Sequence, residues 1–104
     1  MLGKFGNKQP YEEYYLKFNF SEDMAEADSV STIAAVVTTL DDDETDVSTT
    51  MLDATQDYSV GANAYVWIKG GTDAQLYLVT CKILTATLGE KYELEGSILV
   101  MEIS

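Results

Sequence analysis

The 104-residue chain contains no arginine, no histidine, one proline and one cysteine. Without arginine, the bidentate clamp that proteins use for phosphate groups is missing, and the net charge of −12 repels a nucleic-acid backbone. Without histidine, the commonest general base and the commonest neutral metal ligand are missing. Cys81 has no second cysteine for an internal disulfide, which fits a protein that matures in a reducing compartment or one that is indifferent to redox conditions. We therefore expect no catalysis, no cofactor, no metal and no nucleic-acid partner.

Long hydrophobic runs are also missing. No run approaches the length of a membrane span, and the first 15 residues lack the apolar stretch of a signal peptide. A chain of this length forms one domain and buries roughly two-thirds of its unfolded surface. We expect a single domain that needs no disulfide or metal to fold, and no membrane partner.

Apolar and polar residues alternate along several segments, which predicts half-buried strands at residues 14–20, 64–70 and 76–87 and a last strand from Tyr92 onward. A β-branched run favours a strand over residues 29–40, with a helix running from a turn at Ser21 to Ala35 as the alternative. We also expect a short strand at residues 47–52. About seven strands with almost no helix predict an all-β fold, an immunoglobulin/fibronectin-like antiparallel two-sheet sandwich.

Residues 1–13 are expected to form an extended N-terminal arm, with the sandwich domain at residues 14–104. Gly3, Gly6 and Pro10 interrupt regular structure here. The arm has two basic and two aromatic residues that could reach a neighbouring protein, so we expect it to serve assembly more than folding; these are Lys4, Lys8, Phe5 and Tyr11.

A glycine pair stands between two predicted strands. Gly70 and Gly71 can adopt positive φ, which lets the chain leave one sheet and enter the other. Tyr77 then opens the next strand. Its hydroxyl is expected to return to a carbonyl of the loop, as in the tyrosine corner of immunoglobulin-like sandwiches. The alternative is an ordinary core ring.

Four stretches of the chain carry a family resemblance: KQPYEEYYLKFNFS at 8–21, DSVSTI at 28–33, VWIKGGTDAQLYLVT at 66–80 and TATLGEKYELEGSILVME at 85–102. The chain resembles the phage fiber–tail adaptor proteins, small structural proteins of tailed phages and prophages. It departs from them at Glu90, where they have a basic residue, and in its more acidic run at 41–46.

The resemblance implies a non-enzymatic virion protein, assembled in the bacterial host cytoplasm and present in several copies. Its partners would be other virion proteins, because it would link tail and fibre or lie near the head–tail junction. A small-ligand or carbohydrate-binding sandwich is the alternative of a different class.

Two sets of apolar residues are candidate contact surfaces. Tyr65 and Trp67 share one face of their strand, where they could contact a protein, lie under the arm or form a sugar platform. After Gly96, where a bulge is expected, the last strand is apolar on both faces. Either the monomer covers both faces or a neighbouring subunit covers three residues, which are Leu99, Met101 and Ile103.

The acidic run at 41–46 invites a comparison with calcium loops, because calcium prefers oxygen ligands. An EF-hand loop that began at Asp41 would need glycine at its sixth position and glutamate at its twelfth. Asp46 and Leu52 occupy those positions. We therefore expect a solvated loop with no effect of calcium on stability.

Overall fold

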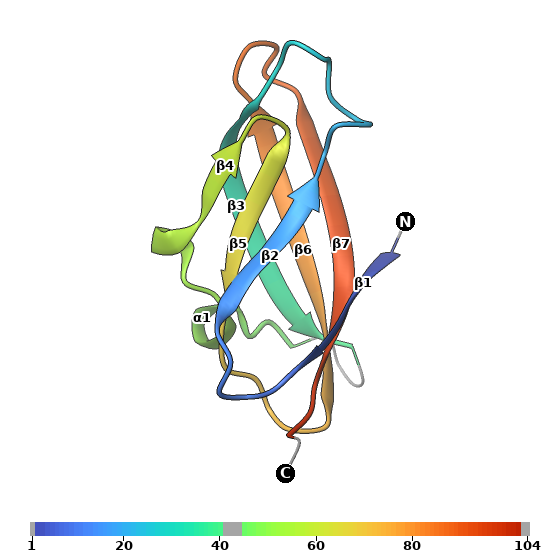
Figure 1. Cartoon of the computed structure of the whole chain (residues 1–104), viewed down its shortest axis with the longest axis vertical. Helices are drawn as coiled ribbons and strands as arrows, with labels where there is room; N and C mark the ends of the chain where they lie inside the picture. Colours follow the sequence, from blue (N-terminus) through green and yellow to red (C-terminus); the bar gives the residue numbers. More distant parts are fainter. Residues whose placement is uncertain (1, 41–44, 103–104) are drawn as a thin grey trace.

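The computed structural model describes residues 2–40 and 45–102 and shows two β-sheets (Figure 1). The strands are β1 (Leu2–Lys8), β2 (Tyr14–Asn19), β3 (Val30–Thr39), β4 (Tyr58–Val60), β5 (Asn63–Ile68), β6 (Gln75–Thr85) and β7 (Lys91–Val100). Two single-turn helices, α1 (Ser48–Met51) and η1 (Ala54–Gln56), lie between β3 and β4.

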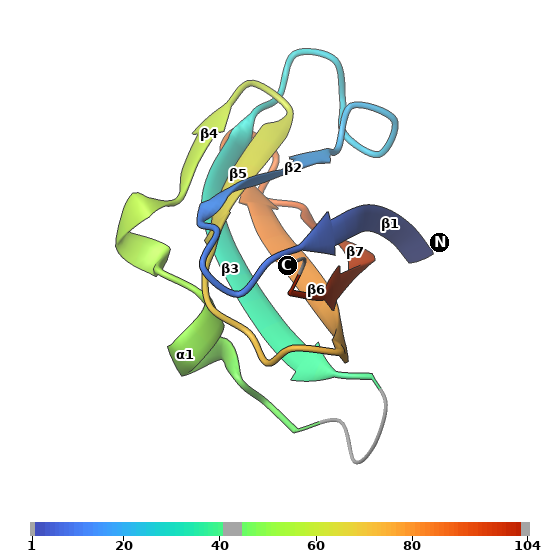
Figure 2. The same cartoon turned by 60° about the horizontal axis from the view of Figure 1, so that its bottom comes forward.

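The sheets pack face to face as two layers (Figure 2). One has the strand order β1-β7-β6-β3 and the other β2-β5-β4. The core between them is built by the inward residues of both sheets, which include Leu16, Phe18, Val37, Ala64, Val66, Ile68, Tyr77, Val79, Cys81, Ile83, Ile98 and Val100. The predicted all-β two-sheet sandwich is confirmed. The alternation read from β5 and β6 is confirmed as well, because every second residue in each is buried.

One pair of strands departs from the predicted antiparallel arrangement. Neighbouring strands pair antiparallel in four ladders, but β1 runs parallel to β7. The parallel direction is allowed because β1 continues into β2 of the other sheet and does not form a hairpin with β7. Residues 2–4, 7 and 8 of the expected arm thus pair with β7 in the four-stranded sheet. The division into arm and sandwich remains a prediction about folding and assembly.

The expected strand at residues 47–52 is wrong, because this segment contains α1. The Asp46 carboxylate accepts hydrogen bonds from the backbone N–H and the hydroxyl of Ser48, at 2.9 and 2.6 Å. The Ser48 hydroxyl oxygen in turn accepts the N–H of Val37, and Met51 is buried in the core. The hydrogen bonds between Asp46 and Ser48 and one buried side chain therefore override the β-propensity of the valine and threonines.

The strand expected over residues 29–40 is confirmed by β3, and the alternative helix to Ala35 is wrong. Before it, the N–H groups of Asp23 and Met24 both donate to the Phe20 carbonyl, which closes the single turn expected after Ser21.

The bulge expected at Gly96 is wrong. The register between β6 and β7 is continuous from Lys91 to Val100, and Gly96 pairs with Val79 without a shift. The inward face therefore continues from Leu94 through Gly96 to the buried end of the strand.

No helix among the described residues is long and apolar enough to cross a membrane. Residues 41–44, four of the six residues in the acidic run that was compared with calcium loops, lie outside the described residues.

Candidate functional site: an aromatic face and a glycine corner

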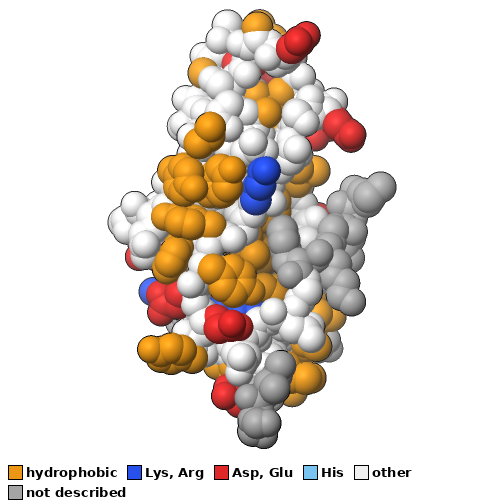
Figure 3. Space-filling model, in the orientation of Figure 1, with side chains coloured by type: hydrophobic (Ala, Val, Ile, Leu, Met, Phe, Trp, Pro, Cys, Tyr) orange, Lys and Arg blue, Asp and Glu red, His pale blue; other side chains and the backbone are white. Residues whose placement is uncertain are grey.

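Four aromatic side chains share the outward face of the three-stranded sheet. The registers place Tyr15 of β2 opposite Trp67 of β5, and Tyr65 of β5 opposite Tyr58 of β4. Because inward residues such as Val66 alternate with them, all four rings point away from the core. Figure 3 shows hydrophobic side chains gathered over these three strands. We call Tyr15, Tyr58, Tyr65 and Trp67 the aromatic face.

The rings of the aromatic face contact one another. Tyr15 stands edge-on to its three neighbours, with centroid distances of 5.0 Å to Tyr58, 6.4 Å to Tyr65 and 4.8 Å to Trp67. Tyr58 and Tyr65 are stacked at 4.6 Å with an interplanar angle of 9°. These geometries are the favoured ones for aromatic pairs, so the rings hold one another in place.

Hydrogen bonds fix two of the rings to the chain. The Tyr15 hydroxyl donates to the carbonyl of Gln56 at 2.9 Å, and the Trp67 indole N–H donates to the Glu13 carboxylate at 3.3 Å. The Asp57 carboxylate accepts the backbone N–H of Trp67. Burial raises the pKa of Asp57, and this hydrogen bond opposes the rise.

The aromatic face remains open to solvent despite these contacts. Tyr15 is 38% exposed and Tyr58 is 44% exposed, and Val60 beside them is 59% exposed. A set of ordered, partly exposed tyrosines and a tryptophan has the composition of a protein-contact hot spot. Sequence reasoning found only two of the four rings, Tyr65 and Trp67. Tyr15 could have been found by the alternation of its strand, whereas the three-residue β4 that carries Tyr58 has no periodic signal.

The glycine corner joins the two sheets, since the chain leaves β5 in one and enters β6 in the other. Gly70 has φ 62° and Gly71 has φ 101°, both in the region that favours glycine. The backbone N–H of Thr72 donates to the Tyr77 hydroxyl oxygen at 2.9 Å. We expected the loop to offer a carbonyl to this hydroxyl, but it offers a donor.

Lys8, at the end of β1, forms hydrogen bonds with this corner. Its side chain is buried, and its ammonium donates to the carbonyl of Gly70 at 2.6 Å and to that of Gln9 at 2.9 Å. Burial lowers the pKa of Lys8, while Glu12 and Glu13 oppose the shift. A lysine proposed to reach a neighbour thus binds its own chain in this structure.

Comparison with known protein families gives a match that covers most of the sandwich. The family described as podophage GP4 fiber-tail adaptor protein gp77 matches residues 8–100. The chain belongs to this fiber-tail adaptor family. No curated protein and no solved structure matches the chain. The resemblance read from the sequence is confirmed. The matched region of the fiber-tail adaptor family spans all strands from β2 to β7, and it includes Lys8, the corner and the aromatic face.

The other candidate contact residues of this fiber-tail adaptor family member lie apart from the aromatic face. Lys4 and Phe5 lie in β1, in the other sheet. Tyr11 is 94% exposed in the loop that leads from β1 to β2. It lines a hollow with Pro10, Glu12, Glu13, Tyr14, Thr50, Lys69 and Gly70.

The end of the last strand supplies the remaining candidates. Leu99 is half-buried between Asn7 of β1 and Leu76 of β6, and Met101 is 40% exposed. Ile103 lies outside the described residues. The predicted interface residues therefore do not form one surface, because those of β5 and those near β7 belong to different sheets.

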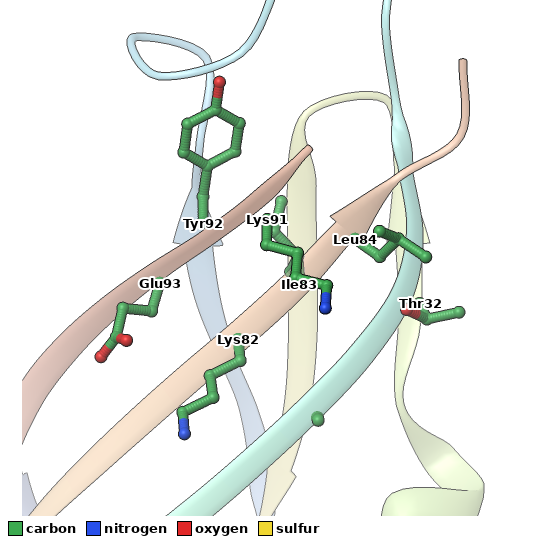
Figure 4. Close-up of a pocket in the computed structure, with 8 residues that line it drawn as sticks. Thr32, Lys82, Ile83, Leu84, Lys91, Tyr92 and Glu93 are labelled. Carbon is green, nitrogen blue, oxygen red and sulfur yellow. The ribbon is translucent and has the colours of Figure 1, made fainter. Parts of the chain in front are cut away.

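A second hollow lies on the outward face of the four-stranded sheet (Figure 4). Its lining mixes Thr32 of β3, Lys82 and Leu84 of β6, and Lys91 and Glu93 of β7. Lys82 stands opposite Glu93 in the register. Positive and negative side chains in neighbouring positions give this hollow no single charge preference.

Proposed function

We propose that the chain is a multi-copy structural adaptor of a tailed-phage particle, which links a fibre to the tail or lies near the head–tail junction. The observation that carries the proposal is the match of the fiber-tail adaptor family to residues 8–100. Its partners are other virion proteins, and it is assembled into the particle in the bacterial host cytoplasm.

We propose that the aromatic face is the contact surface for one of these partners. Support comes from its partial exposure, from the contacts that order its rings and from the bond of Tyr15 to Gln56. Ordered aromatic rings lose little conformational freedom on binding and bury a large apolar area. The hydroxyls at the ring tips can form hydrogen bonds with a partner.

We propose that the adaptor acts by binding and not by catalysis. Cys81, the single thiol of the chain, is buried, and burial raises its pKa to about 12. The nucleophilic thiolate is therefore scarce at neutral pH. Among residues 2–40 and 45–102, no group of three acidic, cysteine or histidine side chains is arranged to hold a metal ion.

A carbohydrate-binding module is the second candidate, and the aromatic face is the observation that favours it, because Asn19 and Asn63 pair at the far end of the same strands. A sugar platform presents a flat ring face to the ligand. Here Tyr58 and Tyr65 stack on each other and Tyr15 stands edge-on to both. The geometry therefore fits a protein partner better than a sugar ring.

The test uses the phage that encodes the chain, with the gene deleted and supplied in trans. Tyr58→Ser and Trp67→Ser remove two rings of the aromatic face, and Leu88→Ser is the control, because Leu88 is 58% exposed on the β6–β7 hairpin. We expect particles carrying the two aromatic variants to lose most of their fibres, whereas the control particles keep theirs. Fibres are counted by electron microscopy.

Circular dichroism of the purified variants shows whether they fold. If particles without the chain keep a full set of fibres, the adaptor role is wrong. If folded Tyr58→Ser and Trp67→Ser chains support normal fibre numbers, the adaptor role stands and the aromatic face is not its contact. Binding of soluble oligosaccharides to the purified wild type, lost in Trp67→Ser, would favour the second candidate.

A further inference from the structure

Carboxylates gather around Trp67, at one end of the aromatic face. The Glu13 carboxylate accepts the indole N–H of Trp67 at 3.3 Å, and the Asp57 carboxylate accepts its backbone N–H at 2.9 Å. Asp53 is bound to the same residue, because its backbone N–H donates to the Trp67 carbonyl. Acidic residues from two separate segments, one before β2 and one around η1, therefore meet at a single tryptophan.

Lysines balance only part of this negative charge. Lys8 interacts with Glu13, and Lys69 interacts with Asp53. The Lys8 ammonium is already bound to backbone carbonyls. Burial, and after it the charge of Asp53, raises the pKa of Asp57, so these two carboxylates repel each other. Three carboxylates thus face two lysines, one of them buried, and this end of the aromatic face keeps an excess of negative charge.

Tyr15 lies between two of these carboxylates. It follows Glu13 by two positions, and its hydroxyl donates to the carbonyl of Gln56, the residue before Asp57. Its ring also contacts Trp67, to which both carboxylates are bound. Because Tyr15 is 38% exposed, a group that covers this ring comes close to both acids.

A planar cation fits this arrangement better than other groups. A guanidinium stacks on an aromatic ring and donates paired hydrogen bonds to a carboxylate, whereas an ammonium is a compact and strongly hydrated charge. The chain has no arginine of its own, and its net charge of −12 attracts a basic partner and repels an acidic one. Lys17, opposite Tyr65 in the register, makes the other end of the face less acidic.

We propose that the partner bound by the aromatic face presents an arginine whose guanidinium stacks on Tyr15 and pairs with Glu13 and Asp57. Apolar residues on either side of that arginine cover Tyr58 and the neighbouring Val60, which are 44% and 59% exposed. This inference rests on the proposed role of the aromatic face and adds the chemistry of the group that it binds. Arginine is also one of the residues that dominate binding at protein interfaces.

The test uses the purified chain and short capped peptides of sequence Leu-Arg-Leu, with citrulline or lysine in place of the arginine in two controls. Trp67 is the only tryptophan, so its indole N–H gives a single NMR signal beside the Glu13 carboxylate. We expect the arginine peptide to shift this signal saturably at millimolar concentration, with an affinity roughly fivefold above that of the citrulline peptide. The lysine peptide should bind more weakly than the arginine peptide, and added salt should weaken the binding of both.

Glu13→Gln combined with Asp57→Asn is the decisive variant, because each amide oxygen still accepts an N–H of Trp67 while the charge is removed. Glu22→Gln combined with Asp23→Asn is the matched control, since both side chains are exposed in the turn after β2 and the change in net charge is the same. We expect the decisive variant to bind the arginine and citrulline peptides equally and the control to keep the difference. If the decisive variant does not fold, Glu13→Gln alone replaces it.

The same variants in phage particles separate this inference from the proposed function. We expect particles to lose fibres with Tyr58→Ser and with the decisive variant, and to keep them with the control. Fibres lost with Tyr58→Ser but kept with the decisive variant would overturn the arginine pairing and leave the aromatic face as the contact. Normal fibres with Tyr58→Ser would overturn both. Equal binding of the three peptides by the wild type, or no saturable shift, would overturn the arginine pairing alone.

Discussion

The Tyr77 hydroxyl offers a sharp test of the corner. Tyr77→Phe keeps the buried ring, which is 3% exposed, so no cavity forms. The change removes only the oxygen that accepts the Thr72 N–H at 2.9 Å. Because Thr72 lies in an exposed part of the loop, water can reach its N–H when the oxygen is gone.

The expected loss of unfolding free energy is therefore that of one net hydrogen bond, about 0.5–1.5 kcal/mol. A domain of this size would melt about 4–6 °C lower for a loss of 1 kcal/mol. Tyr77→Ala, which also empties the ring site, should cost about 3–5 kcal/mol.

Urea unfolding followed by fluorescence of Trp67 measures these differences. Tyr92→Phe is the matched control, because the Tyr92 hydroxyl bonds to the Glu90 carboxylate in an exposed setting. We expect a smaller change in the control than in Tyr77→Phe. Equal midpoints for wild type and Tyr77→Phe would refute the reasoning and leave Tyr77 as an ordinary core ring.

Three further predictions concern stability. Gly71→Ala should lower the free energy of unfolding by about 2–4 kcal/mol, because its Cβ would lie 2.7 Å from the Val100 Cγ2 at a φ of 101°. Gly89→Ala, at a φ of 67° with open space, should lower it by only about 1 kcal/mol. Equal losses of the two variants in urea unfolding would contradict this prediction. The Thr87 N–H and two further backbone donors lower the pKa of Asp28 to about 2. The ionised carboxylate therefore contributes fully to stability above the ordinary pKa of 3.8, and this contribution is lost as the pH falls through about 2. Asp28→Asn should flatten the fall of the urea midpoint over that pH range, and an unchanged pH profile would show that Asp28 is not its cause. Deleting residues 2–8 should lower the melting temperature by several degrees, since β1 loses its pairing with β7 and the corner loses Lys8; an unchanged melting temperature would support the separate arm expected from the sequence.

Most of the fold can be predicted from the alternation of apolar and polar residues along the strands. β2, β5 and β6 were predicted near their observed positions because each buries one face, and burial of one face leaves a period of two in the sequence. The period of two gave no correct prediction where strand pairing or a local side-chain hydrogen bond decides the structure. β1 contains two glycines and pairs parallel, and α1 forms in a strand-like segment because Asp46 binds Ser48.

The site was predicted less completely than the fold. Tyr65 and Trp67 were found because they alternate with buried residues, but the partners that complete the aromatic face come from other strands, at registers that no local pattern reveals. The burial of Lys8 has no sequence signal either, because the Gly70 carbonyl that binds it lies 62 residues away. The carboxylates of Glu13 and Asp57 come from separate segments, and only the fold brings both to Trp67.

The central claim is tested most directly by the position of the chain in the assembled particle. A cryo-electron microscopy map of the phage, at a resolution that separates strands, would show where the seven-stranded sandwich lies. The account predicts sandwich density between the tail and the base of a fibre, with the β2-β5-β4 sheet and its aromatic face against one of the two. A fibre base joined directly to the tail, with the sandwich absent from that joint and from the head–tail junction, would contradict the account.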